Sequence, residues 1–171
     1  PTARVAVIGI GGLGHIALQF LNAWGCRVTA FTSSDDKKQK ALSMGAHDVL
    51  NTKNPAELTA AAGRFDLILT TANVKLDWNA YIATLRPKGR LHFLGVPLEP
   101  LDINVFPLIA NQCAVSGSPV GSPAGIATML SFAQQHKIEP VVEIFRFDQV
   151  NEALARLASG QAKYRIVLSN Q

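Results

Sequence analysis

Short apolar runs alternate along the chain with longer segments in which apolar residues recur every three or four positions. The first run, residues 4–8, is rich in β-branched residues and predicts a buried strand. The next segment has apolar residues at helical spacing from Leu13 to Leu21 and predicts a helix that ends near Trp24. This alternation continues through most of the chain and favours a parallel sheet with helices on both faces.

The same pattern predicts the remaining elements of that sheet. Five further strands are expected at residues 27–32, 47–50, 65–70, 90–94 and 114–117. Helices are expected at residues 36–44, after Asn54-Pro55 and at 77–85, and a proline-marked loop precedes the last of these strands. Beyond them we expect a helix at 124–136, a strand at 141–147, a helix at 149–158 and a last strand at 164–168. Six strands in this rhythm predict an α/β doubly wound sheet, the Rossmann order 3-2-1-4-5-6.

Three glycines in G-x-G-x-x-G spacing separate the first strand from the first helix: Gly9, Gly11 and Gly14. In this spacing the first glycine permits a tight turn, the second lets the backbone approach a pyrophosphate, and the third lets the helix pack on the sheet. Free N–H groups at the helix start would face the anion. The alternative interpretation is a strand-to-helix turn without a ligand.

The end of the second strand bears on the choice of dinucleotide. NAD-binding domains usually carry a carboxylate there, whereas this chain has Thr32, followed by Ser33, Ser34 and Lys37. Hydroxyl, N–H and ammonium groups suit a 2′-phosphate, so we predict NADP(H) over NAD(H). Two alternatives stay open. A serine can simply cap the next helix, and the aspartates at 35 and 36 can reach a ribose hydroxyl.

Composition narrows the class of protein. The chain has 171 residues, 48% of them hydrophobic and 16% charged, with a net charge of +4. This suits one globular domain, and without a long basic run or an apolar span we expect neither nucleic-acid nor membrane binding. Two cysteines and four histidines without ligand spacing predict no metal site in this chain. We expect a cytoplasmic protein.

Several short motifs extend this picture. They are residues 9–15 (GIGGLGH), 32–37 (TSSDDK), 44–48 (MGAHD), 91–96 (LHFLGV), 116–122 (SGSPVGS) and 164–167 (YRIV). Together they resemble the cofactor domain of zinc-dependent medium-chain alcohol dehydrogenases, the cinnamyl alcohol dehydrogenase-like subgroup. The resemblance implies hydride transfer between NADP(H) and a primary alcohol or aldehyde.

The resemblance also implies which residues contact the cofactor. The pyrophosphate would lie on Gly9, Ile10, Gly11, Gly12, Leu13 and Gly14, and the 2′-phosphate among Thr32, Ser33, Ser34 and Lys37. Thr71 would lie beside the cofactor, and Gly95, Val96, Ser118, Pro119 and Val120 would line its nicotinamide half. No residue of this chain is expected to be catalytic or to bind metal, because the family's zinc ligands lie mostly before the cofactor domain.

Residues 1–171 are therefore expected to form a single NADP-binding domain excised from a two-domain enzyme, inactive without its catalytic domain. Two other hypotheses stay open: the cofactor domain of a zinc-free quinone or enoyl reductase, and a stand-alone nucleotide sensor. The apolar segment 104–110 predicts a homodimer of the parent enzyme. Its alternative is a loop folded onto its own core.

Overall fold

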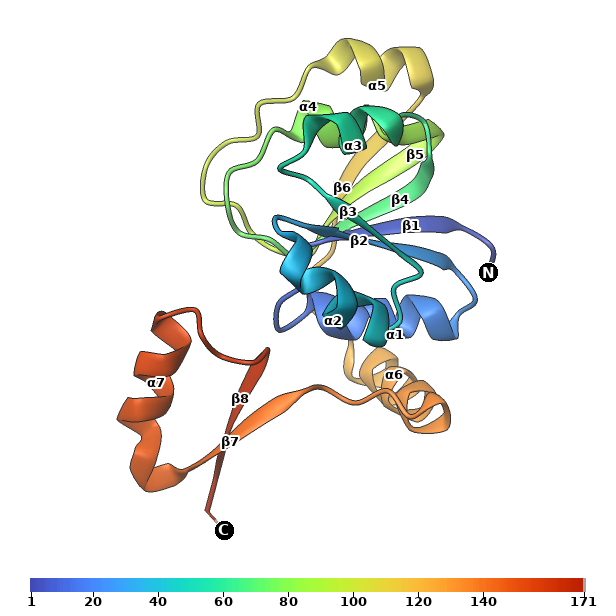
Figure 1. Cartoon of the computed structure of the whole chain (residues 1–171). Helices are drawn as coiled ribbons and strands as arrows, with labels where there is room; N and C mark the ends of the chain where they lie inside the picture. The colour runs from blue at the N-terminus through green and yellow to red at the C-terminus, as the bar shows by residue number, and fades with distance from the viewer. Residues whose placement is uncertain (171) are drawn as a thin grey trace.

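The computed structural model describes residues 1–170 and contains a six-stranded parallel sheet (Figure 1). Its order is β3-β2-β1-β4-β5-β6, which confirms the predicted doubly wound fold. The strands are β1 Arg4–Ile8, β2 Arg27–Thr32, β3 Asp48–Asn51, β4 Phe65–Thr70, β5 Leu85–Phe93 and β6 Ala114–Gly117. The strand order reverses between β1 and β4, and ligands of such sheets bind outside the carboxyl ends of the strands at this point.

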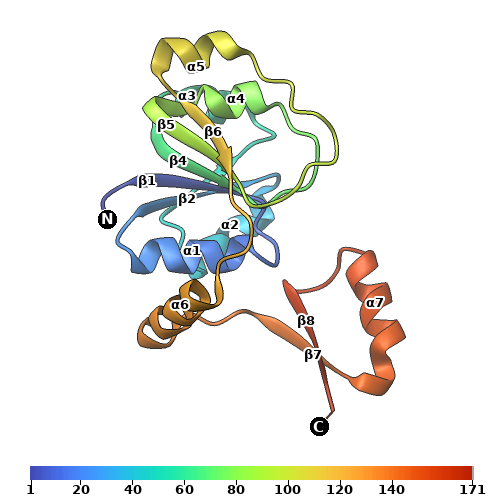
Figure 2. The same ribbon diagram turned by 180° about the vertical axis from the view of Figure 1, so that it is seen from behind.

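Helices cover both faces of the sheet (Figures 1 and 2). On one face lie α1 (Gly14–Ala23) and α2 (Lys38–Ser43), which a short 3₁₀ turn at Asp35–Lys37 precedes. On the other lie α3 (Pro55–Ala60), α4 (Trp78–Ile82) and α5 (Val105–Asn111). Alternate residues of β1 enter two separate hydrophobic clusters, one under each helix layer. This explains why the central strands read as continuous apolar runs.

The largest differences from the sequence prediction are at β5 and α5, and helix α4 ends at Ile82 rather than at residue 85. Strand β5 begins at Leu85 rather than at residue 90, with a register shift at which Phe65 pairs with Leu85 but Leu67 pairs with Arg90. Helix α5 occupies the expected loop, because the Asn104 side chain accepts a hydrogen bond from the N–H of Phe106 and caps it. Its proline lies in the first turn, where no backbone N–H is needed.

The C-terminal part forms a second, smaller unit below the sheet in Figure 1. Helix α6 (Pro123–His136) packs against α1 through ring contacts of Phe132 with Phe20 and Trp24. The strands β7 (Val142–Arg146) and β8 (Arg165–Ser169) then pair in parallel, joined by α7 (Val150–Ala158). The predicted elements of this part are therefore present, but these two strands form a separate sheet.

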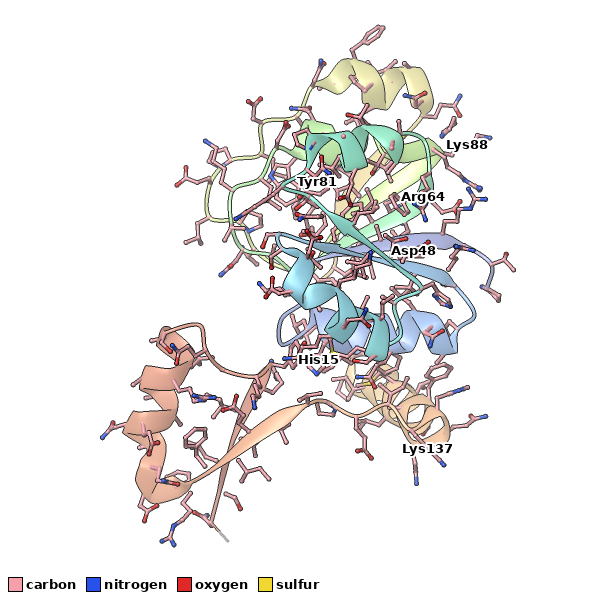
Figure 3. All side chains as sticks on the ribbon, in the orientation of Figure 1. His15, Asp48, Arg64, Tyr81, Lys88 and Lys137 are labelled. Carbon is pink, nitrogen blue, oxygen red and sulfur yellow. The ribbon has the colours of Figure 1, made fainter. Side chains whose placement is uncertain are left out.

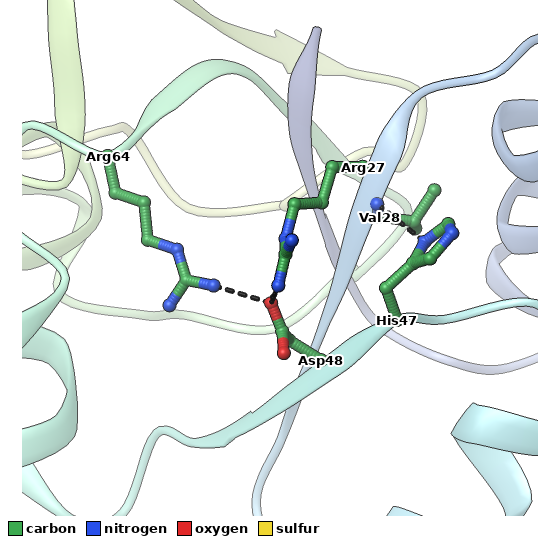
Figure 4. Close-up of polar contacts among 5 residues, drawn as sticks. All are labelled: Arg27, Val28, His47, Asp48 and Arg64. Atoms are coloured by element: carbon green, nitrogen blue, oxygen red, sulfur yellow. Dashed lines mark hydrogen bonds and ion pairs between the residues drawn. The ribbon is translucent and has the colours of Figure 1, made fainter. Parts of the chain in front are cut away.

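The amino ends of the strands carry ion pairs. Figure 3 shows Asp48 and Arg64 close together on the side of the molecule away from the C-terminal unit. The Asp48 carboxylate accepts from Arg64 at 2.6 Å and from Arg27 at 3.3 Å, as the close-up in Figure 4 shows. Beside it, His47 Nδ1 accepts a hydrogen bond of 3.1 Å from the N–H of Val28, so this histidine is part of the sheet edge.

Candidate functional site

The turn that leaves β1 depends on two of its glycines. Gly9 has φ of +86°, a conformation that favours glycine, and its carbonyl accepts a 2.6 Å hydrogen bond from Thr71 Oγ1. A Cβ on Gly14 would lie 2.1 Å from the Gly9 carbonyl oxygen. Helix α1 can therefore begin this close to the strand only with glycine at position 14.

The middle of the glycine loop is open. A Cβ placed on Gly11 would meet no heavy atom within 4 Å. The N–H groups of Gly12, Leu13 and Gly14 have no backbone acceptor within residues 1–170. The first turn of α1 contains no acidic residue. A helix start with unpaired N–H groups and open space before it fits a phosphate group.

Hydroxyl groups at the end of β2 are already partly engaged. Thr32 is buried, and its Oγ1 donates a 2.9 Å hydrogen bond to the Ser34 carbonyl. The Ser34 side chain and the nearby Lys37 ammonium lower the pKa of the exposed Asp36 carboxyl. Ser33 and Lys37 are therefore the predicted side chains best placed to donate to a further phosphate.

Two adjoining cavities lie beside the glycine loop, and Ile10, Thr32 and Lys37 line both. The first, about 210 Å³, extends over the ends of β1 and β2 and also contacts Gly9 and Ser33. The second, about 370 Å³, lies against Gly11 and Gly12. The structure thus brings together most of the residues predicted to hold the pyrophosphate and the 2′-phosphate.

A third cavity of about 480 Å³ lies at the carboxyl ends of β5 and β6, lined by Gly95, Val96 and Ser118 among others. The backbone there is tightly packed, because a Cβ on Gly95 would lie 2.5 Å from the Ala72 carbonyl oxygen. Leu13, Gly14, Ser34, Thr71, Pro119 and Val120 line none of these three cavities. Thr71 instead donates a hydrogen bond to the Gly9 carbonyl in the glycine turn, and Val120 is 86% exposed.

Sequence reasoning assigned no role to several basic residues that the structure places here. Lys40 and Lys163 line the 370 Å³ cavity together with Tyr164. The Lys40 ammonium lies 4.6 Å from the centre of the Tyr164 ring. The Arg165 side chain lies 3.0 Å from a Cβ placed on Gly12. The motif at residues 164–167 could have indicated Tyr164 and Arg165. It lies far along the chain from the glycine loop, so the sequence alone did not predict their contact.

Known proteins share this arrangement. Residues 12–135 match the family described as zinc-binding dehydrogenase. The chain belongs to this family. It is 64% identical to the aldehyde reductase AdhA of Synechocystis sp. over 99% of this chain and 51% of that protein.

Solved structures agree with this assignment. A cinnamyl alcohol dehydrogenase from Sorghum bicolor superposes with a TM-score of 0.93 at 35% identity, over 98% of this chain and 48% of that one. The protein CAD from Helicobacter pylori, solved in complex with NADP(H), gives a TM-score of 0.83 at 30% identity over 98% of this chain and 48% of that one. The chain therefore spans about half the length of these relatives and corresponds to a cofactor domain.

The described residues contain neither a metal-ligand cluster nor a membrane-spanning helix. No group of three or more histidine, cysteine or acidic side chains within residues 1–170 could hold a metal ion. In the same range, no helix has the length and apolar composition needed to cross a bilayer. The glycine loop and its cavities are thus the main candidate site in this part of the molecule.

Proposed function

We propose that residues 1–171 are the NADP(H)-binding domain, excised from a longer enzyme, of a zinc-type alcohol or aldehyde oxidoreductase. The observation that carries the proposal is the open glycine loop with its unpaired N–H groups. The loop shares one cavity with Lys37 through Gly11 and Gly12, and the adjoining cavity with Ser33 and Lys37 through Gly9. Backbone N–H groups suit the pyrophosphate, and a hydroxyl with an ammonium suits one further phosphate. Relatives named as aldehyde reductase and NADP-dependent alcohol dehydrogenase support the same activity.

In this proposal a bound nicotinamide would supply or accept the hydride, and the residues of this chain would hold and orient it. Residues lining the 210 Å³ cavity would hold the adenosine half, and Gly95, Val96 and Ser118 would hold the nicotinamide half. Pro119 and Val120 border that half from the loop after β6. The substrate pocket and the zinc ligands belong to the remainder of the enzyme, so the isolated chain binds dinucleotide without turnover.

The test is a fluorescence titration of the chain with NADPH and NADH. Gly11→Ala places a methyl group in open space, so the chain should fold normally while the NADPH dissociation constant rises at least about tenfold. Gly121→Ala, in the loop before α6, is the matched control and should bind as the parent does. Tighter or equal binding of NADH would remove the preference for NADP(H), and no saturable binding of either would remove the dinucleotide site.

We also propose that the intact enzyme is a cytoplasmic homodimer. Helix α5 turns Leu108 towards the core but exposes Val105 (59%), Phe106 (74%) and Ile109 (71%), beside the edge strand β6. An exposed apolar patch next to an open sheet edge suits a second copy of the chain. Both cysteines are free thiols, as a reducing compartment favours. Sedimentation of the intact enzyme should give a dimer that Phe106→Asp dissociates, and a monomeric parent enzyme would contradict this.

A further inference from the structure

His15 is fully buried one residue into α1, and both of its ring nitrogens are engaged. The N–H of Val141 donates to Nε2 at 3.0 Å. A nitrogen that accepts from a backbone N–H carries no proton, so the proton of the neutral ring lies on Nδ1. Nδ1 then donates to the Gly11 carbonyl oxygen at 2.9 Å. One imidazole thus joins the glycine loop to a segment 126 residues later.

The bond to Gly11 bears directly on the anion site. The Gly11 carbonyl and the Gly12 N–H belong to one planar trans peptide and point in opposite directions. That carbonyl also accepts the backbone N–H of His15 at 3.1 Å. Two donors therefore fix this peptide plane, and with it the direction in which the Gly12 N–H points.

The segment on the other side of His15 leads from α6 into β7 (Figure 3). One turn further along α1, Gln19 Nε2 donates to the Glu139 carbonyl at 3.0 Å, and Gln19 Oε1 accepts from the Glu139 N–H at 3.4 Å. Side chains four residues apart share one helix face. His15 and Gln19 therefore hold residues 139–141 together, but only His15 also contacts the glycine loop.

A third contact joins His15 to the chain before β8. The Tyr164 ring stacks on the imidazole, with centres 4.4 Å apart and planes 28° apart. The Tyr164 carbonyl oxygen lies 2.9 Å from a Cβ placed on Gly12. The C-terminal unit thus contacts His15, next to the glycine loop, through both Val141 and Tyr164.

We propose that His15 is a positioning residue for the dinucleotide, which orients the Gly12 N–H through Nδ1 and couples that orientation to the seating of residues 139–141 through Nε2. The inference rests on the proposed function, because the oriented group would bind the cofactor's pyrophosphate. It predicts that dinucleotide binding orders residues 139–146, which line neither cavity beside the loop.

Three variants separate the two nitrogens of His15. In His15→Asn the side-chain amide nitrogen can replace Nδ1, whereas the Val141 N–H loses its acceptor. In His15→Gln the amide oxygen can replace Nε2, whereas the Gly11 carbonyl loses its side-chain donor. Gln19→Leu is the matched control, because it frees Glu139 without touching the loop. Each is prepared in the 171-residue chain and compared by NADPH titration and by amide hydrogen exchange.

We expect His15→Gln to raise the NADPH dissociation constant about tenfold, and the other two variants to stay within about threefold of the parent. NADPH should slow exchange across residues 139–146 in the parent and in Gln19→Leu, but not in His15→Asn. Equal affinities for His15→Asn and His15→Gln would overturn the positioning role. Protection of residues 139–146 that persists in His15→Asn would overturn the coupling.

The free chain provides a readout that does not depend on the proposed function. If the parent binds neither NADPH nor NADH, the proposed function fails, and the exchange of amides 9–14 without ligand decides the inference. Exchange there should be faster in His15→Gln than in His15→Asn, because only His15→Gln removes the side-chain donor to Gly11. Equal rates at these amides would overturn the inference in that case too.

Discussion

The amino ends of the six parallel strands form one border of the sheet, the amino edge, and their carboxyl ends form the other, the carboxyl edge. Polar groups are paired within the protein at the amino edge and left unpaired at the carboxyl edge. At the amino edge, Asp48 lies between Arg27 and Arg64, and Asp66 pairs with Arg86 and accepts from the Arg4 N–H at 2.7 Å. At the carboxyl edge, three N–H groups of the glycine loop have no backbone acceptor within residues 1–170. At the amino edge these charged groups are paired within the protein, whereas the carboxyl edge leaves backbone donors to which an anion can bind.

This contrast distinguishes polar groups that stabilise the fold from polar groups that are available to bind a ligand. An ion pair made within the protein contributes to stability and leaves no group free to bind a ligand. Backbone N–H groups that stay unpaired beside tightly packed glycines lower the stability of the fold. They gain acceptors only when a ligand binds. Changes at the amino edge should therefore affect folding alone, and changes at the carboxyl edge should affect binding.

Gly14→Ala should have the largest effect, because its Cβ would lie 2.1 Å from the Gly9 carbonyl oxygen. The backbone must move, and we expect the free energy of unfolding to fall by about 3 kcal/mol and the NADPH dissociation constant to rise about 100-fold. Urea unfolding and NADPH titration measure the two. Gly11→Ala is the control for folding, since its Cβ meets nothing within 4 Å. Normal stability of Gly14→Ala would show that the turn is less tightly packed than described.

Lys37→Ala tests the donors at the end of β2. Lys37 lines both cavities beside the glycine loop, and we expect its loss to raise the NADPH dissociation constant about tenfold. NADH lacks the 2′-phosphate, so its affinity should stay unchanged. Lys38→Ala removes the neighbouring exposed lysine and should change neither. An equal loss of NADH affinity would place Lys37 against the pyrophosphate instead.

Much of the sheet could be predicted from the sequence because its signals are local. Strands β1, β2, β4 and β6 have the predicted bounds. In β1 and β2 nearly every residue is buried, and strands buried on both faces form near-continuous apolar runs. Helix α5 was missed because its proline was interpreted as a loop signal, although it lies in the first turn. The early start of β5 was missed because Pro87 and Gly89 lie at its register shift.

The candidate site was predictable only in its local part. The glycine spacing and the serines after β2 can be read directly from the sequence. Whether a hydroxyl is free cannot be read in this way, because Thr32 already donates its hydroxyl to the Ser34 carbonyl within the protein. The link from His15 to Val141 joins residues 126 positions apart, and no local pattern predicts such a contact. The long-range contacts therefore carry the information that the sequence alone did not provide.

Asp48→Asn tests the amino edge. The carboxylate is about one-third exposed and accepts from two arginines, so we expect its loss to lower the free energy of unfolding by about 1.5 kcal/mol. The NADPH dissociation constant should stay within about twofold of the parent value. Asp148→Asn removes the partner of Arg146 in a well-exposed pair and should change stability by less than about 0.5 kcal/mol. A clear loss of NADPH affinity in Asp48→Asn would contradict the separation of the two edges.

His15 should also make the stability of the folded chain depend on pH. Burial lowers its pKa, the nearby Arg165 cation adds to this, and the hydrogen bond with Gly11 opposes it. The folded chain therefore keeps His15 neutral at a pH where the unfolded chain has already bound the proton.

Because the pKa of His15 is lower in the folded chain than in the unfolded chain, the free energy of unfolding decreases as the pH falls. Above about pH 6.5 both states are neutral, and the contribution of His15 to stability is complete. As the pH falls below this value, the unfolded state gains protons first, so the free energy of unfolding decreases by at most about 1.4 kcal/mol per pH unit until the folded state is protonated too. Urea unfolding between pH 7.5 and 5 should show a steeper decrease for the parent chain than for His15→Gln. Parallel curves would mean that folding does not lower the pKa of His15, and that the carboxyl edge is no more sensitive to acid than the rest of the sheet.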